Sequence, residues 1–395
     1  MPMDTINQPV SVPKGQFASS LIIKAEANNL GFSLTGITTP NTPDHFGVFE
    51  SWLAAGYHAD MKYLSRPDAI AKRLQPRELM PDCKSVICLA FPYPNSNNLV
   101  ANENKLTGRI AAYAWLPDYH LTIPILIKEL IERIENKLGR KIGYKAFTDS
   151  APILERDIAQ RAGLGWIGKN SCLIHPVVGS YFLLAEVFVD IEMEVDQPFL
   201  ADRCGSCSRC LEACPTHCIL PDRTIDSHHC ISYLTIENKG PIPRELRKLV
   251  GNWAFGCDIC QLVCPWNMMR VGGEEIQQTP YLGIHPIQNN LIEELPLSDQ
   301  DFKMKYANSP ILRSRRIGYL RNIATVLGNS KNAEAVPALI KSLLGEDEPL
   351  IRESAAWALG QIGGEKARLA LEDRLTQEID SSVQGEIHLA ITQME

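Results

Sequence analysis

Two cysteine motifs contain the residues whose spacing most clearly predicts chemistry. The first begins at Cys204 with the spacing C-x2-C-x2-C-x3-C-P, and the second begins at Cys257 with the spacing C-x2-C-x3-C-P. Three closely spaced thiolates can bind three irons of one cubane cluster, while the cysteine before the proline reaches a second cluster. The motifs therefore predict two ferredoxin-type four-iron clusters and the transfer of single electrons at low potential.

The ligand count agrees with this prediction, because two such clusters need about eight thiolates. The motifs supply seven, and Cys230 between them supplies the last. Cys218 is the competing choice, but only three residues separate it from Cys214, so both would then enter one cluster. Two zinc sites are the alternative, although zinc has no use for a third closely spaced cysteine. By the crossover rule one cluster takes Cys204, Cys207, Cys210 and Cys264, and the other takes Cys214, Cys230, Cys257 and Cys260.

The remaining composition is that of an ordinary globular protein. The chain has 395 residues, of which 45% are hydrophobic and 22% charged, so we expect two or three domains. The formal net charge of −7 argues against a surface that is positively charged throughout, but it is compatible with a local basic face. Residues 1–16 show no secretory pattern. We therefore expect a cytoplasmic monomer without membrane contact, in which the 12 cysteines stay reduced.

Three regions differ in their sequence pattern. In residues 1–200, helical periodicity at 121–138 and apolar β-branched runs at 85–91 and 181–189 predict a mixed α/β domain. In residues 201–270, periodicity fades where metal ligation would replace an apolar core. Residues 271–395 begin with a Gly/Pro/Gln-rich linker at 271–286 and become helical after Leu312. The predicted class is thus α+β with three domains.

An internal repeat marks the last region. Residues 321–329 and 352–364 both start with Arg, continue with small residues and contain Leu-Gly; a weaker third copy starts near Val383. The spacing of about 31 residues is typical of short HEAT-like repeats, with an ordinary helical bundle as the alternative. The Leu-Gly pair predicts a helix that ends at a left-handed residue.

Two segments of the first region carry candidate site residues. The glycine-rich stretch at 163–170 would let a flat cofactor approach the backbone, with Trp166 offering a face, or it is a tight turn between a helix and a strand. Asp149 precedes a helix that Pro152 would start, so Asp149 or Ser150 is an N-cap, or Asp149 is a proton source. No Gly-x-Gly-x-x-Gly follows a strand, and no Walker loop is present.

Nearly the whole chain resembles the epoxyqueuosine reductase family. The order in which a Gly-Leu-Gly-Trp stretch precedes a Cys-Asp-Ile-Cys-Gln stretch is specific to that family. The matching stretches are MKYL at 61–64, RPD at 66–68, DYH at 118–120, DSAP at 149–152, GLGWIGKN at 163–170, CISYLTIE at 230–237 and GCDICQ at 256–261, followed by the helical repeats.

The resemblance implies a cobalamin in the first domain, next to a cluster, and a tRNA carrying epoxyqueuosine as substrate. It makes Asp149 the proton donor and implies an external low-potential electron donor. The cofactor contacts that it implies are Arg66, Asp118, Tyr119, His120, Gly165, Trp166, Lys169 and Asn170. The densest basic stretch of the helical region is either a solvated face or a phosphate-binding surface, formed by Arg313, Arg315, Arg316 and Arg321.

The implied reaction converts an epoxide into an alkene with two electrons and two protons, and the oxygen leaves as water. Asp149 would protonate that oxygen, and burial in an apolar pocket would keep this carboxyl protonated. Two other functions stay open: a cobalamin-dependent reductive dehalogenase, and an electron carrier that docks through its helices. Cobalt in the purified protein would separate the enzymes from the carrier.

Overall fold

A four-stranded sheet organises the first region in the computed structural model, which describes residues 16–95, 106–268 and 290–394. The strand order is β1-β2-β7-β4, and every neighbouring pair is antiparallel. The predicted strands at 85–91 and 181–189 are confirmed as the two central strands. The bounds are β1 (Leu34–Thr38), β2 (Ser85–Pro92), β4 (Tyr144–Phe147) and β7 (Phe182–Val189).

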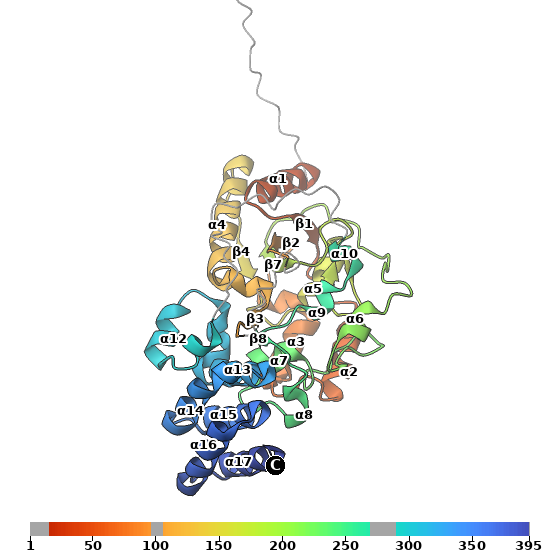
Figure 1. The fold of residues 1–395 in the computed structure, drawn as a ribbon. Helices are drawn as coiled ribbons and strands as arrows, with labels where there is room; N and C mark the ends of the chain where they lie inside the picture. The colour runs from red at the N-terminus through yellow and green to blue at the C-terminus, as the bar shows by residue number, and fades with distance from the viewer. Residues whose placement is uncertain (1–15, 96–105, 269–289, 395) are drawn as a thin grey trace, which may run out of the picture.

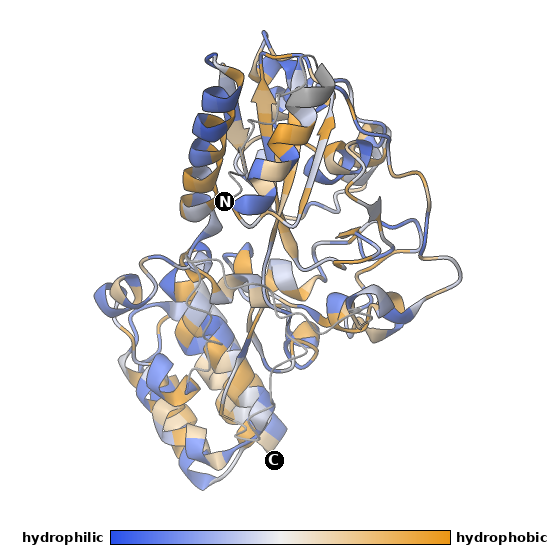
Figure 2. Cartoon of the chain, turned by 90° about the horizontal axis from the view of Figure 1, so that it is seen from above, coloured by the Kyte–Doolittle hydropathy of each residue, from blue (hydrophilic) through white to orange (hydrophobic). Residues whose placement is uncertain are grey.

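Helices cover both faces of this sheet, so the first region is a mixed α/β structure (Figure 1). α1 (Gln16–Asn29) and α4 (Tyr119–Leu138) pack on one face, and α5 (Glu155–Arg161) packs on the other. α4 confirms the predicted helix, and six of its apolar side chains are buried on one face: Ile123, Leu126, Ile127, Leu130, Ile131 and Ile134. In Figure 2 the strands are mostly orange and the helices carry blue beside orange, as the amphipathic pattern requires. None of the helices in the described ranges is long and apolar enough to cross a bilayer.

Short elements connect these layers. α5 begins at Glu155 with Leu154 as its N-cap, so the expected helix start at Pro152 is wrong and neither Asp149 nor Ser150 caps it. The glycine-rich stretch follows α5 and contains β5, and its residues 163–165 form the turn between helix and strand that the turn alternative requires. The remaining elements are α2 (Phe46–Ala54), η1 (Lys62–Leu64), α3 (Pro67–Leu74), η2 (Pro76–Leu79), β3 (Arg109–Ile110), η4 (Ala112–Trp115), β5 (Trp166–Ile167) and β6 (Leu173–Ile174).

The cysteine-rich region packs between the sheet and the C-terminal helices (Figure 1). One strand of this region pairs in parallel with β3 of the first region, where Arg109 lies opposite Trp253. Asp258 also accepts a hydrogen bond from the backbone N–H of Ala112 at 2.8 Å. Backbone pairing therefore fixes the two regions against each other. The elements are α6 (Arg209–Ala213), α7 (Ile231–Ile236), α8 (Arg244–Arg247), β8 (Trp253–Phe255), α9 (Ile259–Leu262) and α10 (Pro265–Met268).

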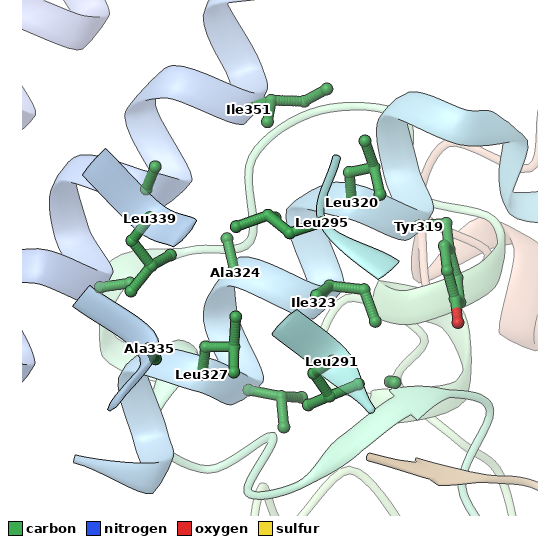
Figure 3. Packing of buried hydrophobic residues seen from close by; sticks show 14 of the residues in the cluster. Leu291, Leu295, Tyr319, Leu320, Ile323, Ala324, Leu327, Ala335, Leu339 and Ile351 are labelled. Atoms are coloured by element: carbon green, nitrogen blue, oxygen red, sulfur yellow. The ribbon is translucent and has the colours of Figure 1, made fainter. Parts of the chain in front are cut away.

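The C-terminal region is a stack of antiparallel helices, and the three predicted repeat copies lie on α13, α15 and α17. Figure 3 shows Leu320, Ile323 and Leu327 of α13 packed among side chains of α11, α14 and α15. The predicted linker at 271–286 lies outside the described residues. The bounds are α11 (Leu291–Glu294), α12 (Asp299–Lys305), η5 (Pro310–Ser314), α13 (Arg315–Ser330), η6 (Ala333–Ala335), α14 (Val336–Gly345), α15 (Pro349–Ile362), α16 (Glu365–Gln377) and α17 (Ser381–Met394).

The repeated Leu-Gly pair does not end these helices, contrary to the sequence prediction. Gly328 and Gly360 lie inside α13 and α15. A Cβ on Gly328 would come within 2.8 Å of the Cα of Ala358, and a Cβ on Gly360 within 2.7 Å of the Cβ of Ala390. The glycines are therefore required because successive repeat helices approach closely at these positions.

Candidate functional site

The structure brings cysteines from both motifs into one group at the outer side of the cysteine-rich region. Burial, followed by the neighbouring thiols of Cys204 and Cys264, raises the pKa of Cys210 to about 11. Trp166 donates its indole N–H to Cys204 Sγ at 3.4 Å. This group contains residues that are about 60 positions apart in the chain, as the crossover of the last cysteine would require.

A second group lies deeper, beside α7 and α9. Burial raises the pKa of Cys257, and the thiols of Cys230 and Cys214 add to this effect. The pKa of Cys260 is raised as well, first by Cys172 and by burial, and then by the thiols of Cys257 and Cys230. The grouping corresponds to the second predicted ligand set. The assignment of individual ligands stays a prediction.

Two further cysteines adjoin the second group: Cys218, which the sequence offered as the competing ligand, and Cys172, which the spacing did not indicate. Cys218 Sγ lies 3.4 Å from Cys214 Sγ and also interacts with Cys230. The thiol of Cys172 interacts with that of Cys260, and this interaction lowers the pKa of Cys172 and raises the pKa of Cys260. The turn between β5 and β6 brings Cys172 there from far along the chain. The only sequence signal was its position two residues after the end of the glycine-rich stretch.

Trp166 does not offer a face to a cofactor, contrary to the sequence expectation. Its side chain is 1% exposed. The ring stacks on Phe199 with centroids 5.6 Å apart and meets Trp266 edge-on at 5.2 Å. Since aromatic rings already cover the indole, Trp166 instead supports the loop that carries Cys204.

The rest of the glycine-rich stretch also supports the cysteine-rich region. Lys169 Nζ donates to the carbonyls of Gly205 and Cys207 at 2.8 and 2.9 Å. A Cβ on Gly165 would collide with the carbonyl of Ile174, so this glycine permits the β5–β6 hairpin. Asn170 is buried, and its side-chain oxygen accepts from the backbone N–H of Cys172 at 3.2 Å. Gly165 and Lys169 thus have contacts within the protein, and their cofactor contacts stay a prediction.

Asp149 lies in the loop between β4 and α5 with a φ of 49°, which is uncommon for a residue other than glycine. Its Oδ2 accepts the hydroxyl hydrogen of Tyr119 at 3.0 Å, and its backbone N–H donates to Glu155 Oε1 at 2.7 Å. The carboxyl of Asp149 is exposed, so the expected burial in an apolar pocket is not present in this structure. It is Glu155 whose pKa is raised, to about 7, by burial and then by the charge of Asp149.

The predicted contacts around Tyr119 belong to the start of α4. Asp118 is its N-cap and accepts from the backbone N–H of His120 at 3.0 Å. The rings of Tyr119 and His120 stack with centroids 4.1 Å apart. Arg66 is exposed and pairs with Asp68 at 3.1 Å. Tyr119 is therefore the member of this group that contacts Asp149.

Tyr113 connects the Asp149 loop with the cysteine-rich region. Its ring centroid lies 6.2 Å from that of Tyr119 and 6.2 Å from that of Phe255. Burial, followed by the charges of Asp258 and Asp149, raises the pKa of Tyr113. Two residues after Phe255 comes Cys257. A row of aromatic contacts thus runs from the Asp149 loop to the segment that carries Cys257.

A basic residue of the C-terminal region borders this same site. Arg313 Nε donates to Glu237 Oε1 at 2.8 Å. Although burial acts in the opposite direction, Glu237, Tyr63 and Asp149 raise the pKa of Arg313. Arg315 is exposed next to it. These two arginines can meet an anionic substrate at the rim of the Asp149 site.

The other two predicted arginines hold the fold together. Arg321 is 1% exposed and donates to the carbonyls of Leu234, Asn238 and Gly240. The prediction that Arg321 binds phosphate is wrong, because its guanidinium is buried against α7 and the loop after it. Arg316 donates to the carbonyl of Leu297 at 2.6 Å and pairs with Glu346.

Three family models match the chain. A model described as "Epoxyqueuosine reductase QueG, DUF1730" matches residues 73–150. A model of the "4Fe-4S double cluster binding domain" matches residues 203–267, and a model of HEAT repeats matches residues 309–391. The second match includes all eight predicted cluster cysteines, and the third agrees with the predicted repeats.

Curated relatives and solved structures agree with these models. The epoxyqueuosine reductase of Pseudomonas aeruginosa is 40% identical over 86% of this chain and 94% of its own length. That of Escherichia coli is 39% identical over 86% of this chain and 88% of its own length. A crystal structure of an epoxyqueuosine reductase with an epoxyqueuosine-modified tRNA-Tyr stem loop superimposes with a TM-score of 0.86 at 31% identity, covering 94% of this chain and 97% of that chain.

Proposed function

The chain belongs to the epoxyqueuosine reductase family, and on that premise we propose that it reduces epoxyqueuosine in tRNA to queuosine. One observation carries the proposal: Tyr119 and Tyr113 connect the Asp149 carboxyl with the segment that holds Cys257. These contacts support a function in which an acid at Asp149 and an electron source at Cys257 act on one substrate. We further propose that the enzyme is a cytoplasmic monomer that receives electrons from an external low-potential donor.

The eight cysteines of the two groups would hold two four-iron clusters. Thiols are the donors that such clusters need, and they occur here in the required number. Side-chain contacts run from Asp149 to the segment of Cys257, so the cluster of this group would be the one that delivers electrons to the reaction. The group of Cys204, next to Trp166, would be the entry cluster.

Cobalamin, which the family resemblance implies, fits the side chains around Asp149. Sites for large flat cofactors combine aromatic faces with a few hydrogen-bonding groups. Tyr113, Tyr119 and Tyr63 supply the aromatic faces, and Asp149 with Arg313 supplies the polar groups. The bound cofactor would supply low-potential electrons to the epoxide carbon.

Side chains of this protein would donate the proton that the reaction needs and orient the donor. An alkoxide leaves poorly from carbon, so the oxygen of the opened epoxide needs a proton as it departs. Once the bound cofactor and substrate cover the exposed carboxyl of Asp149, this residue would hold the proton and pass it to the oxygen. Tyr119 would orient the carboxyl through its 3.0 Å hydrogen bond. A second proton from solvent then completes the water, so one epoxide, two electrons and two protons give one alkene and one water.

Arg313 and Arg315 would hold the tRNA. Arg313 lies in η5 just before the first repeat helix, Arg315 is the first residue of α13, and Arg313 is close enough to Asp149 for their charges to interact. A phosphate bound by these arginines would bring a wobble nucleotide to the Asp149 rim. Unlike Arg321, both side chains are available at the surface.

Nucleoside analysis tests the proposal. Purified tRNA that carries epoxyqueuosine is incubated anaerobically with reconstituted protein, cobalamin and a strong reductant. We expect epoxyqueuosine to disappear and queuosine to appear in equal amount. Unchanged epoxyqueuosine with fully loaded protein would contradict the proposed function.

A further inference from the structure

A second carboxyl group contacts the Asp149 loop, and the proposed reaction does not use it. Glu155 is the first residue of α5, and its Oε1 accepts the backbone N–H of Asp149 at 2.7 Å. This contact is with the backbone of the proton donor, so it acts on the position of Asp149 and leaves its carboxyl free.

Asp149 needs such a contact because of its backbone conformation. A φ of 49° costs a residue with a side chain about 1 kcal/mol or more. The strand before it is fixed, since Thr148 donates its hydroxyl to the carbonyl of Leu184 at 2.8 Å. Among the described residues, Asp149 itself forms hydrogen bonds with Glu155 and Tyr119. Loss of the Glu155 contact would let the loop relax away from Tyr119.

The surroundings of Glu155 make its charge sensitive to pH. Glu186 on β7 is fully buried, and neither of its carboxylate oxygens has a hydrogen-bond partner among the described residues. It lies opposite Phe147 on β4, on the face of the sheet that α5 covers. The pKa of Glu186 is raised by burial and then by the charges of Glu155 and Asp149.

The other charged groups near Glu155 act in both directions. Burial and the charge of Asp149 raise the pKa of Glu155 to about 7, while Arg156 and Arg73 act to lower it. Tyr119 also interacts with Glu155. Above pH 7 Glu155 is therefore mostly a carboxylate, and below pH 7 it is mostly a neutral acid.

We propose that Glu155 is a positioning residue that latches Asp149 in its working pose, and that the latch weakens when Glu155 takes up a proton. A carboxylate accepts an N–H hydrogen bond about twice as strongly as a neutral group does. The latch rests on the proposed function, because its purpose is to hold the proton donor of that reaction. It has a structural readout that needs no turnover.

Hydrogen exchange of the Asp149 backbone amide directly measures the hydrogen bond to Glu155. The experiment uses the full-length, cluster-loaded protein. After correction for intrinsic exchange, we expect protection in the wild type to fall about tenfold between pH 8 and pH 6. Glu155→Gln keeps a neutral acceptor, so its protection should be low and constant across this range. Glu155→Ala should lose protection at both pH values. Wild-type protection in Glu155→Ala would overturn the proposal.

Turnover measurements distinguish a positioning role of Glu155 from a merely structural contact. Glu155→Ala should lower kcat about tenfold or more while the KM for tRNA stays unchanged, and Glu155→Gln should restore part of the loss. Glu192→Ala, which removes an exposed carboxylate elsewhere, is the matched control. A normal kcat in Glu155→Ala would overturn the positioning role. If the wild type itself does not convert epoxyqueuosine, the proposed function fails, whereas the exchange experiment still decides on the latch.

Discussion

At the scale of single residues, Asp149 is tested by a change that keeps its shape. Asn tolerates a positive φ about as well as Asp, so Asp149→Asn should keep the loop in place. Its amide cannot act as an acid at neutral pH, so turnover should fall by a factor of about 10² to 10⁴. Single-turnover nucleoside analysis measures the loss, and iron content shows that the clusters remain. Asp373→Asn, an exposed position on α16, serves as the control. Full activity of Asp149→Asn would remove Asp149 from the reaction.

A second residue-scale prediction concerns acid stability in the repeat helices. Burial acts to raise the pKa of Glu378, but hydrogen bonds from Arg352, from the backbone of Asp380 and from Arg374 lower it to about 2. The ordinary value is 4.5, so the lowered pKa contributes stability above pH 4.5 that is lost as the pH falls toward 2. Glu378→Gln should cost about 3 kcal/mol of unfolding free energy at pH 6 and clearly less at pH 3. Denaturant unfolding at the two pH values measures this, and an equal cost at both would contradict the ion-pair account.

Residue roles divide into those that sequence could predict and those that it could not. Cysteine spacing predicted the two thiol groups, because ligand geometry restricts which positions can share a cluster. The roles of Trp166, Lys169 and Arg321 were not predictable, since each depends on a partner from a distant segment. A tryptophan can offer its face to a ligand or be covered by other rings. A lysine or an arginine can bind a phosphate or donate to backbone carbonyls, so the residue type alone does not decide the role.

At the scale of elements, the contact between repeat helices depends on the absence of a side chain. Gly360→Ala should lower unfolding free energy by about 1 to 3 kcal/mol, because the added methyl collides with Ala390 of α17. Gly345→Ala at the end of α14 meets nothing within 4 Å and is the matched control. Thermal unfolding should show a Tm lower by several degrees for Gly360→Ala alone. Equal Tm values for both variants would contradict the close approach of the helices.

The elements themselves were largely predictable, and their ends were not. α4, β2 and β7 have long, regular apolar patterns that favour one structure. The start of α5 was misplaced at Pro152, because proline at a first helical turn is a preference and does not fix the helix start. The glycines of the repeats were misread as helix ends, since a glycine that permits close packing has the same sequence signal as one that ends a helix.

At the scale of the whole molecule, the C-terminal helices are fixed to the cysteine-rich region by buried polar contacts. Arg247 of α8 pairs with Glu353 of α15 at 2.7 Å and with Glu386 of α17 at 2.9 Å. Asn322 of α13 donates to the carbonyls of Thr235 and Ala254. The repeats therefore hold a constant position relative to Asp149, so a tRNA bound to them would be presented in one orientation.

The tRNA surface is tested by charge reversal at the rim. Arg313→Glu with Arg315→Glu should weaken tRNA binding and reduce its salt dependence by about one unit of slope for each lost phosphate contact. Lys366→Glu, which reverses an exposed positive charge on α16, is the control and should bind normally. Binding measured across a salt series decides this, and unchanged affinity in the double variant would place the tRNA elsewhere.

Iron and sulfide analysis of anaerobically prepared wild-type protein tests the central claim most directly, which is that two clusters supply the Asp149 site with electrons. We expect about eight irons and eight acid-labile sulfides per chain, and electron paramagnetic resonance of the reduced protein should show two interacting four-iron clusters. Bound zinc, or only about four irons per chain, would contradict the account.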